Sequence, residues 1–155
     1  MRQTLQTALD ELSRDLGLDG LTLSPDGETA IRIEDVEIGI TLMPALGQVH
    51  FLSIIGDMPD TDGKELSQVL LAANHMGAMT SGASIGYDAE ADLITLNLFL
   101  PVAQVTKDAL ASALERMANV TAGWRSNLPT LREIDAAAAP AAPNSASGGE
   151  SWLRL

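Results

Sequence analysis

The sequence has no cysteine and few aromatic residues: two Trp, one Tyr and two Phe among 155 residues. Without cysteine the chain cannot form a disulfide framework, a thiolate metal site or a cysteine nucleophile. Basic residues are also scarce, since nine Lys and Arg stand against 21 Asp and Glu and give a formal net charge of −12 at pH 7. Such a chain would repel phosphates, which argues against nucleic-acid binding.

Long apolar runs are missing too. None approaches the ~20 residues that a membrane-spanning helix needs, and the N-terminal residues Met1–Thr4 lack the basic start and apolar core of a signal peptide. We therefore expect a cytoplasmic protein that does not insert into membranes. The apolar residues that are present, 46 % of the chain, are enough for the core of one domain of this length.

The periodicity of the apolar residues predicts three helices and five strands. Helical spacing occurs in the segments 2–16, 63–76 and 106–128. Gly17 and Pro129 follow the ends of the first and third segments, and Thr106 caps the start of the third. Alternation predicts strands near 29–34, 36–43, 49–55, 83–87 and 93–100. Short links between successive strands favour antiparallel pairing. The predicted fold class is α+β, an antiparallel sheet with flanking helices in the order α-β-β-β-α-β-β-α; a further short strand near Leu21 is left open.

The second predicted helix is apolar around more than half of its girth. Leu71 and Ala72 widen the stripe that Leu66, Val69 and Leu70 form at helical spacing. A helix of this kind needs more than one surface to cover it. The pattern therefore indicates a subunit interface on this helix.

The C-terminal segment has a different composition. From Thr130 onward Ala, Pro, Ser, Asn and Gly predominate, and this leaves too little apolar bulk to offset the entropy of ordering. We therefore predict a domain over residues 1–128 and a disordered tail over 129–155 that ends in the letters SWLRL. Trp152 within it is either incidental or part of a short docking motif.

The sequence offers little catalytic chemistry. His50 and His75 lie far apart and belong to no metal-binding motif. The aspartates of segment 57–62 resemble the start of a calcium loop but lack its later Gly and Glu. Gly82–Gly86 spells the GxSxG motif around Ser84, yet a strand runs through it where a nucleophile elbow needs a helix to follow. We therefore expect neither an enzyme nor a bound metal or cofactor.

Several short aliphatic motifs follow one another in a characteristic order. They are Leu70–Asn74, Gly82–Asp88, Leu93–Leu96 and Leu100-Pro101, preceded by Leu16–Leu18, Leu21 and the turn Asp26-Gly27, and followed by Leu110, Leu114 and Trp124. Together they resemble the class I type III secretion chaperones, the Tir-chaperone family, over about residues 2–128. The resemblance implies a homodimer in the cytoplasm of a Gram-negative bacterium. It also implies that the protein holds the N-terminal region of one secreted effector in extended, export-competent form.

In that family the effector adds a strand to a sheet edge and inserts aliphatic side chains into apolar patches. The resemblance implies that the first helix and the adjoining sheet line such patches, here Leu5, Leu9, Leu12, Leu16, Ile31, Ile33, Ile38 and Ile40. It implies a dimer contact through the second helix, here Leu66, Val69, Leu70, Leu71 and Ala73. It leaves the secretion-system ATPase open as a further partner.

Other interpretations remain open at the level of sequence. Each of these apolar residues can equally belong to the core. A regulatory or structural α+β dimer that binds no effector fits the same acidic chain without catalytic motifs. A hydrolase that uses Ser84 is a third, weaker hypothesis.

Overall fold

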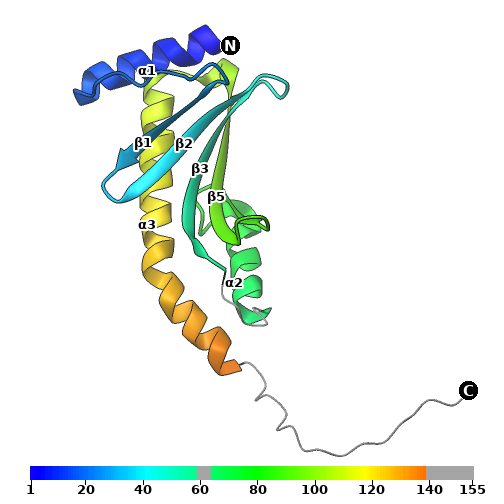
Figure 1. Ribbon diagram of the computed structural model, residues 1–155. Helices are drawn as coiled ribbons and strands as arrows, with labels where there is room; N and C mark the ends of the chain where they lie inside the picture. The colour runs from blue at the N-terminus through cyan, green and yellow to red at the C-terminus, as the bar shows by residue number, and fades with distance from the viewer. Residues whose placement is uncertain (59–63, 139–155) are drawn as a thin grey trace, which may run out of the picture.

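The computed structural model describes residues 1–58 and 64–138, with side chains for 1–58 and 65–133. Its elements are α1 (Arg2–Leu16), β1 (Glu28–Ile33), β2 (Val36–Met43), β3 (Gln48–Asp57), α2 (Lys64–Asn74), β4 (Ser84–Asp88), β5 (Leu93–Pro101) and α3 (Lys107–Ala138). Two short 3-10 turns, η1 (His75–Gly77) and η2 (Val102–Gln104), follow α2 and β5. The predicted α+β class and the order of its elements are confirmed (Figure 1).

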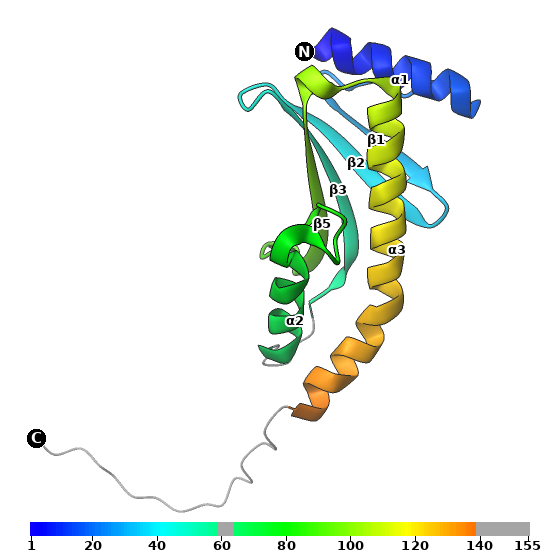
Figure 2. The same ribbon diagram turned by 180° about the vertical axis from the view of Figure 1, so that it is seen from behind.

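The strands of the described chain form one antiparallel sheet in the order β1-β2-β3-β5-β4. Strands β1 and β4 are therefore its two edges. Helix α3 runs along one face of the sheet, α1 crosses near the start of α3, and α2 lies by the β4–β5 end (Figures 1 and 2). No helix of the described residues covers the opposite face in either view.

Alternation along the strands divides their side chains between the two faces. In β2, Val36, Ile38 and Ile40 are buried on the side of the helices, whereas Glu37 on the other face is exposed. This is the pattern of a sheet with one packed and one open face. The core therefore lies between the sheet and the three helices.

Polar side chains of α1 organise the segment that follows the helix. The hydroxyl of Ser13 accepts a hydrogen bond from the backbone N–H of Leu21 (2.9 Å), and the amide of Gln6 donates to the carbonyl of Leu21 (2.9 Å). The backbone N–H of Leu23 donates to the same Gln6 side chain (2.9 Å). Because α1 already satisfies these backbone groups, the segment near Leu21 is a loop and not the additional strand that the sequence left open.

Helix α3 extends further than the sequence predicts. The helix continues through Pro129 to Ala138, so the predicted domain boundary after residue 128 and the disordered tail from 129 are corrected by ten residues; residues 139–155 lie outside the described part. A proline inside a helix removes one backbone hydrogen bond and bends the axis, and α3 bends toward its orange end in Figure 1. Tertiary contacts offset this cost.

Those contacts join the end of α3 to the end of β3. Leu128 is buried and packs so closely on Gly56 that a Cβ at Gly56 would lie 2.7 Å from the Leu128 Cδ2. The guanidinium of Arg132 donates to the carbonyl of Asp57, and Leu131 packs against the core. Neither α3 nor another helix of the described ranges has the length and apolar character to cross a membrane.

Candidate functional site

The structure places most of the predicted effector-binding residues in the core. Six of the eight are buried: Leu5, Leu9, Leu12, Ile31, Ile38 and Ile40. A side chain without exposed surface cannot contact another chain unless α1 moves away from the sheet. These six residues belong to the core of the chain, although Leu12 also lines the hollow described next, so their role in effector binding stays a prediction. Leu16, which is 54 % exposed, and the half-buried Ile33 keep accessible surface.

These two accessible residues meet in one hollow. We name it the α1–α3 groove; it measures about 240 Å³ and is lined by Leu12, Leu16, Ile33, Glu34, Val36, Ala111, Leu114, Glu115, Ala118, Asn119 and Ala122. The residues come from the end of α1, the turn between β1 and β2, and the middle of α3. Buried Leu12, Val36 and Leu114 contribute apolar side chains to it. The family resemblance implies three of the eleven residues, Leu12, Leu16 and Ile33, and misses the α3 side, because no local signal tells which helix faces which strand.

Two carboxylates line the α1–α3 groove. Glu34 occupies the turn between β1 and β2, and Glu115 projects from α3; within the described ranges neither forms an ion pair. Two cations of the described chain have partners outside the groove lining. Lys107 contacts Asp15 (2.5 Å), and this hydrogen bond raises the pKa of Lys107. Arg125 donates to the carbonyls of Asp35 (2.9 Å) and Ile54 (2.7 Å).

The two edges of the sheet differ in how far they are covered. At β4, the side-chain amide of Asn74 donates to the carbonyl of Ile85 (3.0 Å) and accepts from its N–H (2.7 Å). Asn74 thus pairs with the edge as a neighbouring strand would. At β1, two bonds from the described residues reach the outer backbone, and both join Glu28 to Ser24: the N–H of Ser24 donates to the carbonyl of Glu28 (2.7 Å), and the N–H of Glu28 donates to the hydroxyl of Ser24 (3.1 Å). The rest of β1 is an open edge, and its last residue, Ile33, lines the α1–α3 groove.

The residues predicted for the dimer contact on α2 fall into two groups, as those of α1 do: some are buried in the core and the others keep accessible surface. Leu66, Leu70 and Ala73 are buried in the chain's own core. These three residues form the inner side of α2. Only two of the five predicted contact residues therefore keep accessible surface. Val69 is half-buried and Leu71 is 71 % exposed.

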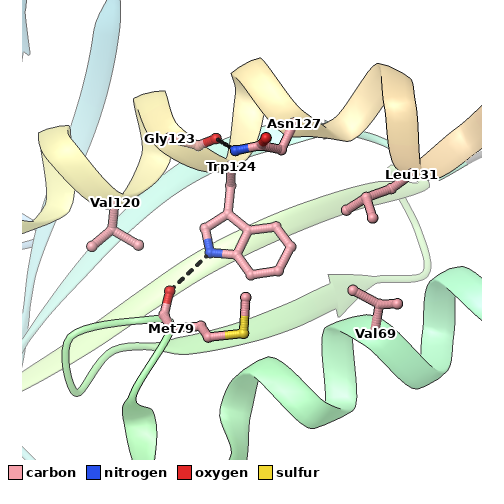
Figure 3. A pocket seen from close by; sticks show the side chains of 7 residues that line it. All are labelled: Val69, Met79, Val120, Gly123, Trp124, Asn127 and Leu131. Atoms are coloured by element: carbon pink, nitrogen blue, oxygen red, sulfur yellow. Dashed lines mark hydrogen bonds between the residues drawn. The ribbon is translucent and has the colours of Figure 1, made fainter.

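A larger hollow lies beside α2. We name it the α2–α3 groove; it measures about 480 Å³ and is lined by Val69, Met79, Val120, Gly123, Trp124, Asn127 and Leu131 (Figure 3). The indole N–H of Trp124 donates to the carbonyl of Met79 (3.1 Å), and the amide of Asn127 donates to Gly123 (2.7 Å). Because these polar groups bond within the wall, the groove offers mainly apolar contact.

The GxSxG letters around Ser84 do not adopt the geometry of a nucleophile elbow. Gly82 and Ala83 lead directly into β4, which begins at Ser84, so the strand-to-helix elbow that a nucleophilic serine needs is not formed here. His50 stacks on Phe99, with ring centroids 4.6 Å apart, and its Nε2 lies 2.9 Å from the side-chain oxygen of Asn97. Of the aspartates that resemble a calcium loop, Asp60 and Asp62 lie outside the described residues.

An antiparallel sheet with one open edge, next to a small apolar groove, defines a scaffold that can hold an extended polypeptide. The sequence matches the Tir chaperone protein (CesT) family over residues 7–125. This is well over half of the chain, and the chain therefore belongs to that family. No curated protein matches it.

Solved structures share the fold at low sequence identity. The chain is similar to a chain of the HopA1–SchA chaperone–effector complex (TM-score 0.70, 19 % identity, 81 % of this chain and 95 % of that chain). It is similar to a chain of the ExsC–ExsE complex (0.71, 16 %, 81 % and 94 %). A third likeness is to the Yersinia pestis type III secretion chaperone SycH in complex with a fragment of YscM2 (0.63, 16 %, 77 % and 98 %). At these identities the likeness shows the fold alone.

Proposed function

We propose that this protein is a cytoplasmic type III secretion chaperone that holds the N-terminal region of an effector, here called the guest, in extended form for export. The observation that carries the proposal is the open edge of β1 beside the α1–α3 groove in a member of the CesT family. The chaperone complexes among the structures of the same fold support it. Binding alone is sufficient for this function, so no catalytic step is needed.

The open edge supplies affinity that depends little on the guest sequence. A guest strand paired with β1 bonds through its backbone, and alternate side chains of that strand turn toward the helices. Ile33 and Leu16 are the accessible apolar residues there. At β4, Asn74 already occupies the backbone of Ile85, which favours β1 as the edge that receives the guest.

We further propose that the protein is a homodimer that forms its contact through the outer face of α2. Leu71 on α2 and Met76 on η1 are strongly exposed, and the α2–α3 groove opens beside Val69. Apolar surface of this extent on one side of a domain is typical of an interaction site. By family resemblance the secretion-system ATPase is a third partner, to which the loaded chaperone is delivered.

Magnitudes favour a guest that contacts both subunits. Ordering ~50 guest residues costs roughly 50–100 kcal/mol at ~1–2 kcal/mol per residue. At ~25 cal/mol per Å² this requires about 2,000–4,000 Å² of apolar burial, besides hydrogen bonds. The α1–α3 groove, at about 240 Å³, can bury only a small part of that area. The guest must therefore wrap around the pair of subunits.

Co-purification tests the function directly. The untagged protein is isolated from cells in which it is naturally expressed, and its partners are identified by mass spectrometry. We expect one dominant partner, and limited proteolysis should show that its N-terminal region is the part retained. Recovery of the protein only with itself would contradict the chaperone function and favour a regulatory or structural dimer. Multi-angle light scattering measures the subunit number in the same samples.

A further inference from the structure

The α1–α3 groove combines an apolar lining with negative charge at one end of an open strand edge. Ile33, the last residue of β1, lines it, and the next residue in the chain is Glu34. Glu34 has φ +54°, a left-handed conformation that Gly or Asn adopts with less strain. A glutamate at this position is not required by the turn. Its carboxylate instead adds charge where the edge of β1 meets the groove.

Within the described ranges, no ion pair involves either carboxylate of the groove. Glu115 lines the same hollow from α3, and the lining contains no Lys, Arg or His. Lys107 is bound to Asp15, and Arg125 is bound to Asp35 and to backbone carbonyls. The chain as a whole carries −12. The field in the groove therefore favours a cation.

We propose that the α1–α3 groove selects the guest: it accepts an aliphatic side chain, and Glu34 and Glu115 bind a Lys or Arg close to it in the guest strand. This site rests on the proposed function, because the guest strand is placed by pairing with β1. In such a strand every second side chain faces the helices, so the aliphatic residue enters the groove beside Ile33. The basic residue then lies at the β1–β2 turn, next to Glu34.

Size and charge argue against other occupants of the groove. About 240 Å³ is less than the ~300–1,000 Å³ of typical small-molecule sites, and suits the insertion of a side chain. Anionic lipid headgroups and nucleic acids would be repelled by the two carboxylates. A second copy of the chain is assigned to the outer face of α2 and not to this groove, whose two carboxylates it would also bring close to its own excess of acidic residues. A basic, aliphatic peptide segment is the occupant that complements both properties.

Two peptide probes test the charge selection. Both are fluorescent 12-residue peptides of alternating Thr and Leu, and they differ only in two adjacent residues, Arg-Arg in one and Gln-Gln in the other. They are titrated into the native chain, into Glu34→Gln/Glu115→Gln and into Glu90→Gln/Glu133→Gln, which makes the same charge change at exposed sites outside the groove lining. We expect the native chain and the control to bind the Arg peptide about fivefold more tightly than the Gln peptide, and the groove variant to lose this preference.

The outcomes separate this site from the general charge of the protein and from the chaperone function. A preference that persists in Glu34→Gln/Glu115→Gln, or that falls equally in the control, would refute selection by the groove, as would binding of neither peptide. The methyl signals of Leu16 and Ile33 in NMR spectra should shift when the Arg peptide binds; unchanged signals would refute its location. If the natural guest co-purifies undiminished with the groove variant, the selection fails while the chaperone function stands. If the native chain retains no guest, the function itself fails.

Discussion

Alanine substitutions at Leu9 and Leu16 separate the core from the binding surface within one helix. Leu9 is 0 % exposed, whereas Leu16, the last residue of α1, is 54 % exposed and lines the α1–α3 groove. Leu9→Ala leaves a cavity and should lower the free energy of unfolding by about 2–5 kcal/mol. Full burial of a leucine contributes about 1.5–3 kcal/mol, so a half-exposed Leu16 can gain about 1 kcal/mol from a guest. Leu16→Ala should therefore weaken guest binding about fivefold and change stability by less than about 1 kcal/mol.

Two measurements decide between these expectations. Urea unfolding followed by circular dichroism gives the stability of each variant, and fluorescence anisotropy gives its affinity for the labelled N-terminal segment of the co-purified guest. Native affinity in Leu16→Ala would remove this residue from the binding surface. Native stability in Leu9→Ala would contradict the packing of α1 on the sheet. A loss of stability of similar size in both variants would mean that the end of α1 is core as well.

Three further substitutions test separate parts of the structure. Gly56→Ala would place a Cβ 2.7 Å from the Cδ2 of Leu128, so overpacking should lower the free energy of unfolding by about 1–3 kcal/mol; an unchanged urea midpoint would contradict the packing of the end of α3. Asn74→Ala removes both hydrogen bonds to the backbone of Ile85. The backbone N–H of Ile85 should then exchange faster with solvent, and the free energy of unfolding should fall by about 1–3 kcal/mol. Slow exchange of this N–H would show that another group covers β4. Leu71→Glu, at a side chain that is 71 % exposed, should halve the mass in light scattering and leave the circular dichroism spectrum native, and a dimer of native mass would exclude this face of α2 as the contact.

The periodicity of the sequence was sufficient to predict the elements but not their surroundings. The leucines of α1 recur at helical spacing, which identifies one buried face without saying whether it packs on the chain's own sheet or on a partner. The structure buries Leu5 and Leu9 and leaves Leu16, the last residue of α1, accessible. Helix α1 crosses α3 near the start of α3 (Figure 1). Only the position of the helix on the sheet decides which of these leucines can meet a guest.

Long-range contacts account for what the sequence did not predict. The Ala-rich, Pro-containing composition after residue 128 suggested a tail, yet the close fit of Leu128 on Gly56 and the bond from Arg132 to Asp57 belong to a helix that continues to Ala138. The bond between Asn74 and Ile85 joins α2 to an edge strand. Neither contact has a local signal, since each depends on how the elements pack.

The asymmetry of the two sheet edges, together with the net charge, offers a reason why β1 can stay open without pairing with the β1 edge of another copy. An open edge strand is a template for pairing with any other chain, including another copy. On β1 the exposed Glu28 and Arg32 discourage flat pairing of apolar strands, and two copies that each carry −12 repel one another over roughly 10 Å in ordinary salt. A basic guest is attracted by the same field. If the proposed site is correct, the acidity of the chain leaves the backbone of β1 available to a guest of opposite charge and discourages pairing with β1 of another copy. Higher salt should weaken both effects together: the guest should be released, and the empty protein should associate beyond the dimer. Size-exclusion chromatography at 0.1 M and 1 M salt would measure both effects. At about 1 M salt screening acts over ~3 Å, so an empty protein that forms no larger species there would show that charge is not what protects this edge.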